Sequence, residues 1–268
     1  MFHLHLHHIN LSGYFWILLV LFPRDAVKLL YYGHPHILMG NIKTGIPGFD
    51  DILKGGLPEH AALLVSGVPG VGKTIMALQY IYEGLKNGEP CMFISCEIDE
   101  QSILTYAASF GLDIAHYTND LLTIVYEPIT GKVVTLGTIM NTILKRQIKR
   151  VALDSLTLFQ YLETSDIAFR KQISDFISNM KSNGITLVVT SEREIGQLDN
   201  IVYRPEDFLF DGLVFMIKIR KGSTYERCIT IAKLRSQEHL TGIYPFTIQH
   251  GGITIFPAQI PFSLIEQQ

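Results

Sequence analysis

Gly67-Val68-Pro69-Gly70-Val71-Gly72-Lys73-Thr74 decides the fold of this 268-residue chain. The stretch fits the pattern G-x-x-x-x-G-K-[ST], and it lies between an apolar run, 62–66, and a helical pattern, 75–86. In such a loop the backbone N–H groups turn inward to cradle a phosphate, and the following helix adds the positive end of its dipole. We therefore expect these eight residues to bind nucleotide phosphates. Lys73 would reach the β- and γ-phosphates, and the Thr74 hydroxyl would take one Mg²⁺ position.

Short apolar runs alternate with helical patterns along the rest of the chain. Four more runs are continuous, as in strands covered on both faces: 91–96, 122–126, 151–154 and 185–191. Apolar residues recur at helical spacing between 166 and 181: Phe169, Ile173, Phe176, Ile177 and Met180. Turn residues join the final runs, at 213–220, 227–234, 244–249 and 253–256. The pattern predicts an α/β fold with a mostly parallel central sheet flanked by helices and finished by C-terminal antiparallel hairpins.

Two carboxylates follow apolar runs in this pattern. Asp154 ends the run 151–154, which would place it at the carboxyl edge of the sheet, beside the phosphate loop, to hold Mg²⁺ directly or through water. Glu97 follows the first strand after the loop's helix, where a carboxylate can orient the water that attacks a γ-phosphate. An ordinary strand-end carboxylate is the alternative for Glu97. Asp99 and Glu100 are expected to begin the next helix.

Composition excludes several classes of protein. The chain has 22 Lys and Arg against 25 Asp and Glu, which excludes binding to nucleic acid through bulk positive charge. A hydrophobic fraction of 47%, with 15 Phe and 12 Tyr, excludes a disordered chain. The three cysteines are too few for a disulfide framework, so a reducing, cytoplasmic setting is expected.

Residues 1–38 differ in character from the rest of the chain. A His/Leu alternation precedes nine uninterrupted apolar residues, 14–22. A membrane helix needs about 20 such residues, and no Lys or Arg precedes the run as it would in a secretory signal. We expect two parts: an atypical apolar and His-rich extension, 1–38, outside the true reading frame, and a single domain, 39–268, starting at Met39. If the native protein contains residues 1–38, a peripheral membrane anchor becomes the better interpretation.

Further motifs surround the phosphate loop. Before it come Thr44-Gly45-Ile46-Pro47-Gly48-Phe49-Asp50 and Gly55-Gly56-Leu57-Pro58; after it come Ile231-Ala232-Lys233-Leu234-Arg235, His239, Tyr244-Pro245-Phe246-Thr247-Ile248 and Gly252-Ile253-Thr254-Ile255. Over about residues 42–257 the chain resembles the KaiC-like branch of RecA-type P-loop ATPases, and most of all the single-domain archaeal KaiC-like proteins and RadA paralogues.

The resemblance implies a RecA-like core that binds ATP and Mg²⁺ between the subunits of a homo-oligomer, with a hexameric ring expected. It also implies that Lys233 and Arg235 act on the neighbouring subunit's γ-phosphate, as positively charged fingers do in phosphoryl transfer. One position departs from the family. Two adjacent glutamates often follow the strand after the P-loop helix, but here the second position is Ile98.

These residues leave three functions open. The first is a slow Mg²⁺-ATPase, in a regulatory or DNA-repair-associated role like that of recombinase paralogues, and the intact Lys-x-Arg pair favours it. The second is a nucleotide-gated scaffold with an unknown protein partner, which Ile98 favours. The third is an autokinase acting on Ser223 or Thr224, although Ser and Thr are ordinary in a hairpin turn. Thr190-Ser191-Glu192 would occupy the position that senses the γ-phosphate.

Charge does not support DNA as a partner. The segments that would face DNA in recombinase relatives, about 158–167 and 193–211, carry more acidic than basic residues. The basic cluster Lys145-Arg146 and Lys149-Arg150 is typical of a helix C-terminus, where cations complement the dipole.

Overall fold

The computed structural model describes residues 8–11, 15–21, 27–31, 40–127, 136–157, 165–195 and 201–265. The chain divides into two units, residues 1–39 and 40–268. In the first unit, strands β1 (His8–Leu11), β2 (Phe15–Leu21) and β3 (Val27–Tyr31) form an antiparallel sheet. The apolar run 14–22 therefore contains strand β2. Among the described residues, no helix combines the length and apolarity needed to cross a membrane.

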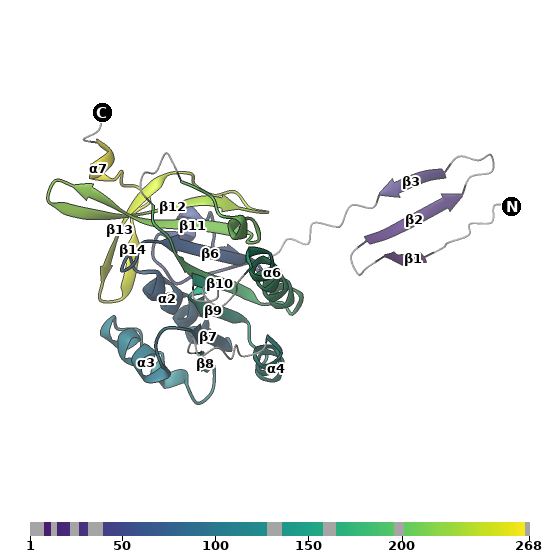
Figure 1. The fold of residues 1–268 in the computed structure, drawn as a ribbon, viewed down its shortest axis with the longest axis horizontal. Coiled ribbons are helices and arrows are strands. Elements are labelled where there is room, and N and C mark those ends of the chain that lie inside the picture. The colour runs from purple at the N-terminus through teal and green to yellow at the C-terminus, as the bar shows by residue number, and fades with distance from the viewer. Residues whose placement is uncertain are drawn as a thin grey trace. The chain divides into compact units, whose positions relative to one another are not determined.

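A nine-stranded sheet organises the second unit (Figure 1). Six strands run parallel, in the spatial order β11, β6, β10, β9, β7, β8, and β12, β13 and β14 extend the β11 edge with antiparallel pairings. The strands are β6 (Ala62–Gly67), β7 (Cys91–Ser95), β8 (Leu122–Tyr126), β9 (Arg150–Asp154), β10 (Thr186–Glu192), β11 (Gly212–Lys221), β12 (Thr224–Leu234), β13 (Ile243–Gln249) and β14 (Gly252–Ile255). The predicted RecA-like α/β fold is confirmed.

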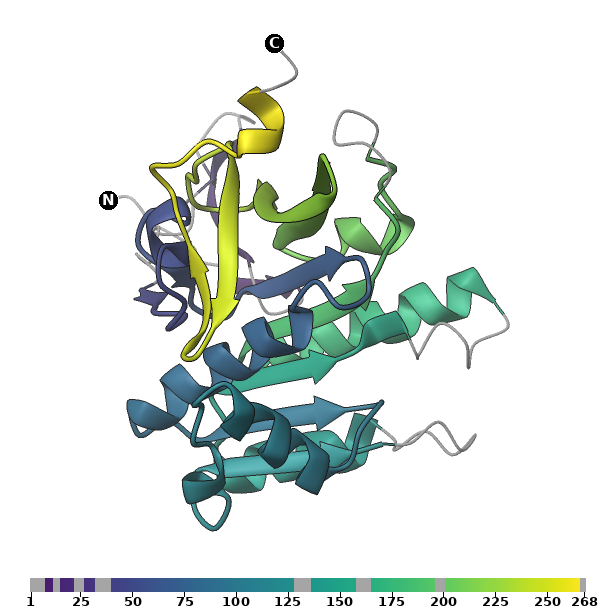
Figure 2. The same cartoon turned by 90° about the vertical axis from the view of Figure 1, so that its left-hand side faces the viewer.

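Helices cover both faces of this sheet (Figures 1 and 2). Helices α2 (Lys73–Lys86) and α3 (Glu100–Ser109) pack on one face, and α4 (Leu136–Arg146) and α6 (Asp166–Ser182) pack on the other. Each face has its own apolar core, which explains why the central strands are apolar throughout: all six residues of β6 are buried. Smaller elements complete the unit: β4 (Asn41–Ile42), α1 (Phe49–Ile52), β5 (Leu57–Pro58), η1 (Ala115–Tyr117), η3 (Pro205–Phe208) and α7 (Phe262–Ile265).

The helix predicted over 166–181 forms as α6, and the apolar residues that predicted it are all buried: Phe169, Ile173, Phe176, Ile177 and Met180. Ser165 caps it by accepting a hydrogen bond from the backbone N–H of Ala168. The prediction for α3 also holds, because Asp99 caps that helix and Glu100 is its first residue.

The basic cluster at 145–150 is only partly a helix end. Helix α4 ends at Arg146, as expected, but Arg150 opens strand β9 and is 2% exposed. Its guanidinium pairs with Glu89, donates to the Lys43 carbonyl at 2.7 Å, and lies over the Tyr80 ring. The helix-end interpretation of Arg150 was wrong, because Arg150 lies in a strand and its side chain is buried against partners from other segments of the chain.

Candidate nucleotide-binding site

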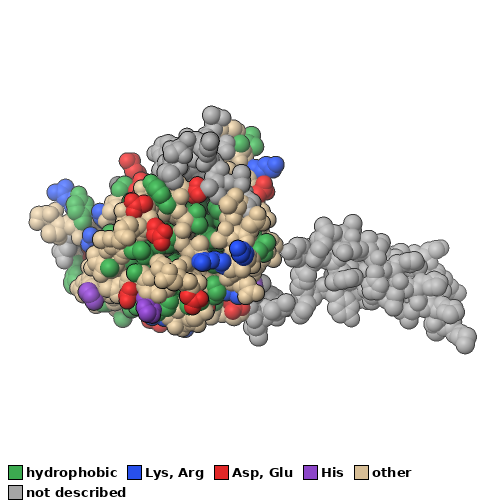
Figure 3. All heavy atoms as spheres, turned by 90° about the horizontal axis from the view of Figure 1, so that it is seen from below, with side chains coloured by type: hydrophobic (Ala, Val, Ile, Leu, Met, Phe, Trp, Pro, Cys, Tyr) green, Lys and Arg blue, Asp and Glu red, His purple; other side chains and the backbone are tan. Residues whose placement is uncertain are grey.

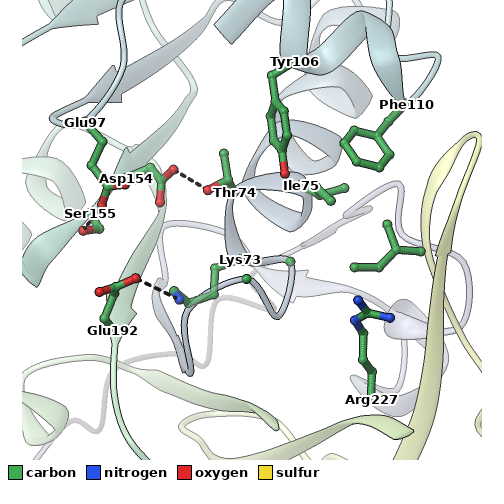
Figure 4. Close-up of a pocket in the computed structure, with 13 residues that line it drawn as sticks. Lys73, Thr74, Ile75, Glu97, Tyr106, Phe110, Asp154, Ser155, Glu192 and Arg227 are labelled. Carbon is green, nitrogen blue, oxygen red and sulfur yellow. Dashed lines mark hydrogen bonds and ion pairs between the residues drawn. The ribbon is translucent and has the colours of Figure 1, made fainter. Parts of the chain in front are cut away.

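The glycine-rich loop joins β6 to α2 and opens toward a cavity of about 410 Å³ (Figure 4). Gly70 (φ +68°) and Gly72 (φ +118°) take left-handed conformations that favour glycine. Gly72 lies directly before α2 and offers no side-chain cap, and the first turn holds no acidic residue. By contrast, α3 and α6 are each capped by a side chain. The N–H groups at the start of α2 are thus left for an anion.

Lys73 is buried at the floor of this loop. Its ammonium donates to the carbonyls of Gly67 at 3.0 Å and Val68 at 3.1 Å, and lies 3.8 Å from a carboxylate oxygen of Glu192. Burial lowers the pKa of Lys73, although nearby carboxylates, Glu192 first, partly oppose the shift. Among the described residues only Glu192 pairs with this cation within 4 Å, at the long distance of 3.8 Å, so the ammonium can also bind a phosphate group.

Thr74 and Asp154 meet at the carboxyl edge of the sheet. The Thr74 hydroxyl donates to Asp154 Oδ2 at 2.7 Å, and the buried Thr190 hydroxyl donates to Oδ1. Burial raises the pKa of Asp154, and the two hydroxyl donors oppose the rise. A hydroxyl beside a carboxylate is the hard oxygen set that Mg²⁺ takes together with substrate phosphates, so these residues fit the ion. The described residues contain no cluster of three His, Cys, Asp or Glu side chains arranged for a metal.

Glu97 lines the cavity on the side of Asp154 and Ser155, and it is exposed (Figure 4). Its Oε1 accepts a hydrogen bond from the buried Ser155 hydroxyl at 3.1 Å. Partial desolvation and the neighbouring Asp154 raise the pKa of Glu97, which suits a carboxylate that takes a proton. Position 98 does not line the cavity: Ile98 packs against the core, and its backbone N–H and carbonyl both bond to the Ser95 hydroxyl.

Sequence reasoning missed the other end of the cavity. Tyr106 and Phe110, in and just after α3, lie near Ile75, and Arg227 of β12 extends its guanidinium into the same end of the cavity (Figure 4). Ile248 of β13 also lines the cavity. The Arg227 Nε is buried with no hydrogen-bond partner among the described residues. Only a prediction of how α3, β12 and β13 pack beside the loop would have found these residues, because no local motif carries them.

Lys233 and Arg235 lie outside this cavity. Lys233 is near the end of β12, and Arg235 follows the strand. Their side chains donate to consecutive backbone carbonyls of η3: Lys233 Nζ to Asp207 O at 2.9 Å, and Arg235 Nη2 to Phe208 O at 3.1 Å. Burial and the neighbouring Arg235 lower the pKa of Lys233. The structure thus brings together Lys73, Thr74, Glu97 and Asp154 and holds this pair of cations apart from them.

Both arginines of the segment 193–211 are used inside the fold. Arg193 is buried against Asp207, and Arg204 donates to the Glu192 carbonyl at 3.2 Å. Residues 158–164 and 196–200, which belong to the two segments considered for DNA, lie outside the described residues. On the face drawn in Figure 3, acidic and basic side chains are scattered and form no continuous basic stripe.

The fold and the loop define a P-loop nucleotide-binding protein. A family model described as "ATPase: KaiC" matches residues 42–260, and the chain belongs to this KaiC ATPase family. It is 34% identical over 238 residues to the circadian clock oscillator protein KaiC of Synechococcus elongatus, covering 83% of this chain and 45% of that protein. The KaiC of Acaryochloris marina is 36% identical over 231 residues, covering 81% of this chain and 44% of that protein. The chain spans about half the length of these curated relatives.

Proposed function

We propose that this chain hydrolyses ATP with Mg²⁺ and that its site is completed by a neighbouring copy in a homo-oligomeric ring. The observation that carries the proposal is the convergence of Lys73, Thr74, Asp154 and Glu97 on one cavity at an uncapped helix start. Membership of the KaiC ATPase family supports ATP as the nucleotide.

Each residue has a role that its position suits. The loop N–H groups and Lys73 bind the phosphates, while Thr74 and Asp154 would hold Mg²⁺, which would supply positive charge to offset that of the phosphates. Glu97 orients a water and accepts its proton as the water oxygen bonds to the γ-phosphorus. The bond between that phosphorus and the β–γ bridging oxygen breaks, and ADP and phosphate leave. Phe110, Tyr106 and Arg227 form the end of the cavity suited to the base and ribose.

Lys233 and Arg235 complete the site from the next subunit. Neither residue lines the cavity of its own subunit. Arg235 is exposed and Lys233 is half-buried, so both cations can be reached from outside the subunit. A finger arginine is worth about 10³–10⁵ in rate in related phosphoryl transfers. The resemblance to KaiC-like proteins supports a hexameric ring, and the cysteine usage supports a cytoplasmic setting.

Mixing two inactive variants tests the proposal. K73A lacks the phosphate-binding lysine, and R235A lacks the finger, so neither is expected to release phosphate alone. In head-to-tail rings that assemble at random from equal amounts of the two variants, about one quarter of the interfaces join the intact P-loop of an R235A subunit to the intact Arg235 of a K73A subunit. The mixture is therefore expected to regain about a quarter of the wild-type rate. A mixture as inactive as its components would overturn completion of the site by a neighbour.

A nucleotide-gated scaffold is the second candidate, and Ile98 favours it because one carboxylate stands where the family often has two. For such a scaffold we expect ATP to bind with full affinity and phosphate release to be absent at every protein concentration.

We also propose that residues 39–268 form the domain and suffice for nucleotide binding.

A further inference from the structure

A buried ion pair lies between the P-loop and the turn that holds Lys233 and Arg235. Arg193 directly follows β10, and Asp207 lies in η3; their side chains are 4% and 1% exposed and approach to 2.5 Å. Such a pair costs several kcal/mol to desolvate and is weak evidence for stability as such. Its position therefore calls for another explanation.

Asp207 is anchored through each of its oxygens. One carboxylate oxygen accepts from Arg193, the other accepts from the Arg204 backbone N–H at 2.8 Å, and the Asp207 carbonyl accepts from Lys233 Nζ at 2.9 Å. The next carbonyl, of Phe208, accepts from Arg235, and the Phe208 ring lies 6.0 Å from Lys233 Nζ. The short turn η3 thus fixes both cations, and the Asp207 carboxylate fixes the turn.

Arg193 ties this turn to the P-loop. Its backbone N–H donates to the Gly67 carbonyl at 3.1 Å, and the same carbonyl accepts from Lys73 Nζ at 3.0 Å. Its side chain also donates to the Val202 carbonyl at 3.2 Å and lies over the Phe215 ring of β11. A continuous set of hydrogen bonds therefore runs from Lys73 through Gly67, Arg193 and Asp207 to Lys233.

We propose that the Arg193–Asp207 pair is a positioning element that sets the Lys233 and Arg235 side chains for the nucleotide of the neighbouring subunit, using the subunit's own P-loop as its reference. This inference rests on the proposed function, because it needs the two cations to act on a neighbour. Arg193 and Asp207 touch no substrate; they act by fixing the η3 carbonyls that the two cations bind.

R193K is the main test variant. Lysine keeps the buried charge but lacks the planar fork that reaches both Asp207 and the Val202 carbonyl. We expect fluorescent-nucleotide binding and KM for ATP to stay near wild type, while kcat falls at least about tenfold, since finger cations act mainly in the transition state. D207N is the second variant, and it should behave in the same way if it folds. K54Q is the control: it breaks the exposed Lys54–Glu238 pair just beyond Arg235 without touching η3, and should keep the wild-type rate.

Subunit mixing separates this role from a structural one. R193K mixed with K73A should regain about a quarter of the wild-type rate, because K73A subunits supply correctly held fingers to intact R193K sites. A wild-type kcat for R193K would overturn the inference. So would a mixture of R193K and K73A that stays inactive under conditions in which the mixture of R235A and K73A recovers activity. If R235A with K73A also fails to recover, the proposed function itself is wrong and the inference falls with it.

Discussion

Replacing Glu97 with glutamine should separate catalysis from binding at this site. The amide keeps the size of the side chain and an oxygen that can accept the Ser155 hydroxyl, which lies 3.1 Å from Oε1, so the local structure has no reason to change. It removes the ability to take a proton from water. A positioned general base contributes about 10²–10⁴ in rate. At 1.36 kcal/mol per tenfold, E97Q should raise the barrier by about 2.7–5.4 kcal/mol.

The assay is phosphate release at saturating Mg²⁺ and ATP, with nucleotide affinity measured in parallel. E97Q is expected to bind ATP as tightly as wild type or more tightly, because a carboxylate repels the phosphates. E100Q is the matched control: Glu100 is exposed in the first turn of α3 and does not line the cavity, so its rate should not change. If E97Q kept more than half of the wild-type rate, the assignment of Glu97 as the base would be refuted.

The pH profile gives a second view of Glu97. The carboxylate must be deprotonated to act, and its pKa is raised above the ordinary 4.5 by desolvation first and then by Asp154. Activity should therefore fall as the pH drops through a value above 4.5, with the loss complete below it. Glutamine does not titrate, so the residual activity of E97Q should lack this limb.

Three further predictions concern the rest of the unit. T190V removes the hydroxyl that donates to the buried Asp154 and should cost about 1.5–3 kcal/mol of unfolding free energy, measured by denaturant titration, whereas T190S should cost less than half as much. D154N should instead raise the stability of the protein in the absence of nucleotide. Because burial raises the pKa of Asp154, its ionisation lowers stability as the pH rises through that pKa, so above that pKa the variant should melt at a higher temperature than wild type, while the melting shift that wild type shows with Mg²⁺ and ATP should vanish. Limited proteolysis should leave a core that starts near residue 40 and still binds ATP. Cleavage within residues 40–127 as fast as cleavage before residue 40 would contradict the proposed boundary.

The local signals in the sequence predicted much of the fold and half of the candidate site. The P-loop, Asp154 and Glu97 each lie at or just after the carboxyl end of a strand in a contiguous pattern, so the rule that parallel strands end at one edge was enough to bring them together. The helical spacing of Phe169 to Met180 likewise predicted the buried face of α6, because residues three or four positions apart lie on one side of a helix.

What the sequence did not reveal depends on residues from separate elements. Arg227 reaches the cavity only because β12 and β13 fold past the loop, and Arg193 meets Asp207 across fourteen positions. Arg150 looked like a surface cation beside a helix end, yet Glu89 and the Lys43 carbonyl make it a buried one. In each case the partner that decides the side chain's role lies on another segment.

Phosphate release as a function of protein concentration tests the central claim most directly. If Lys233 and Arg235 complete the neighbour's site, specific activity should rise with protein concentration and then saturate as subunits assemble. A specific activity that stays constant from the most dilute sample upward, in protein shown to be monomeric there, would contradict a site shared between subunits.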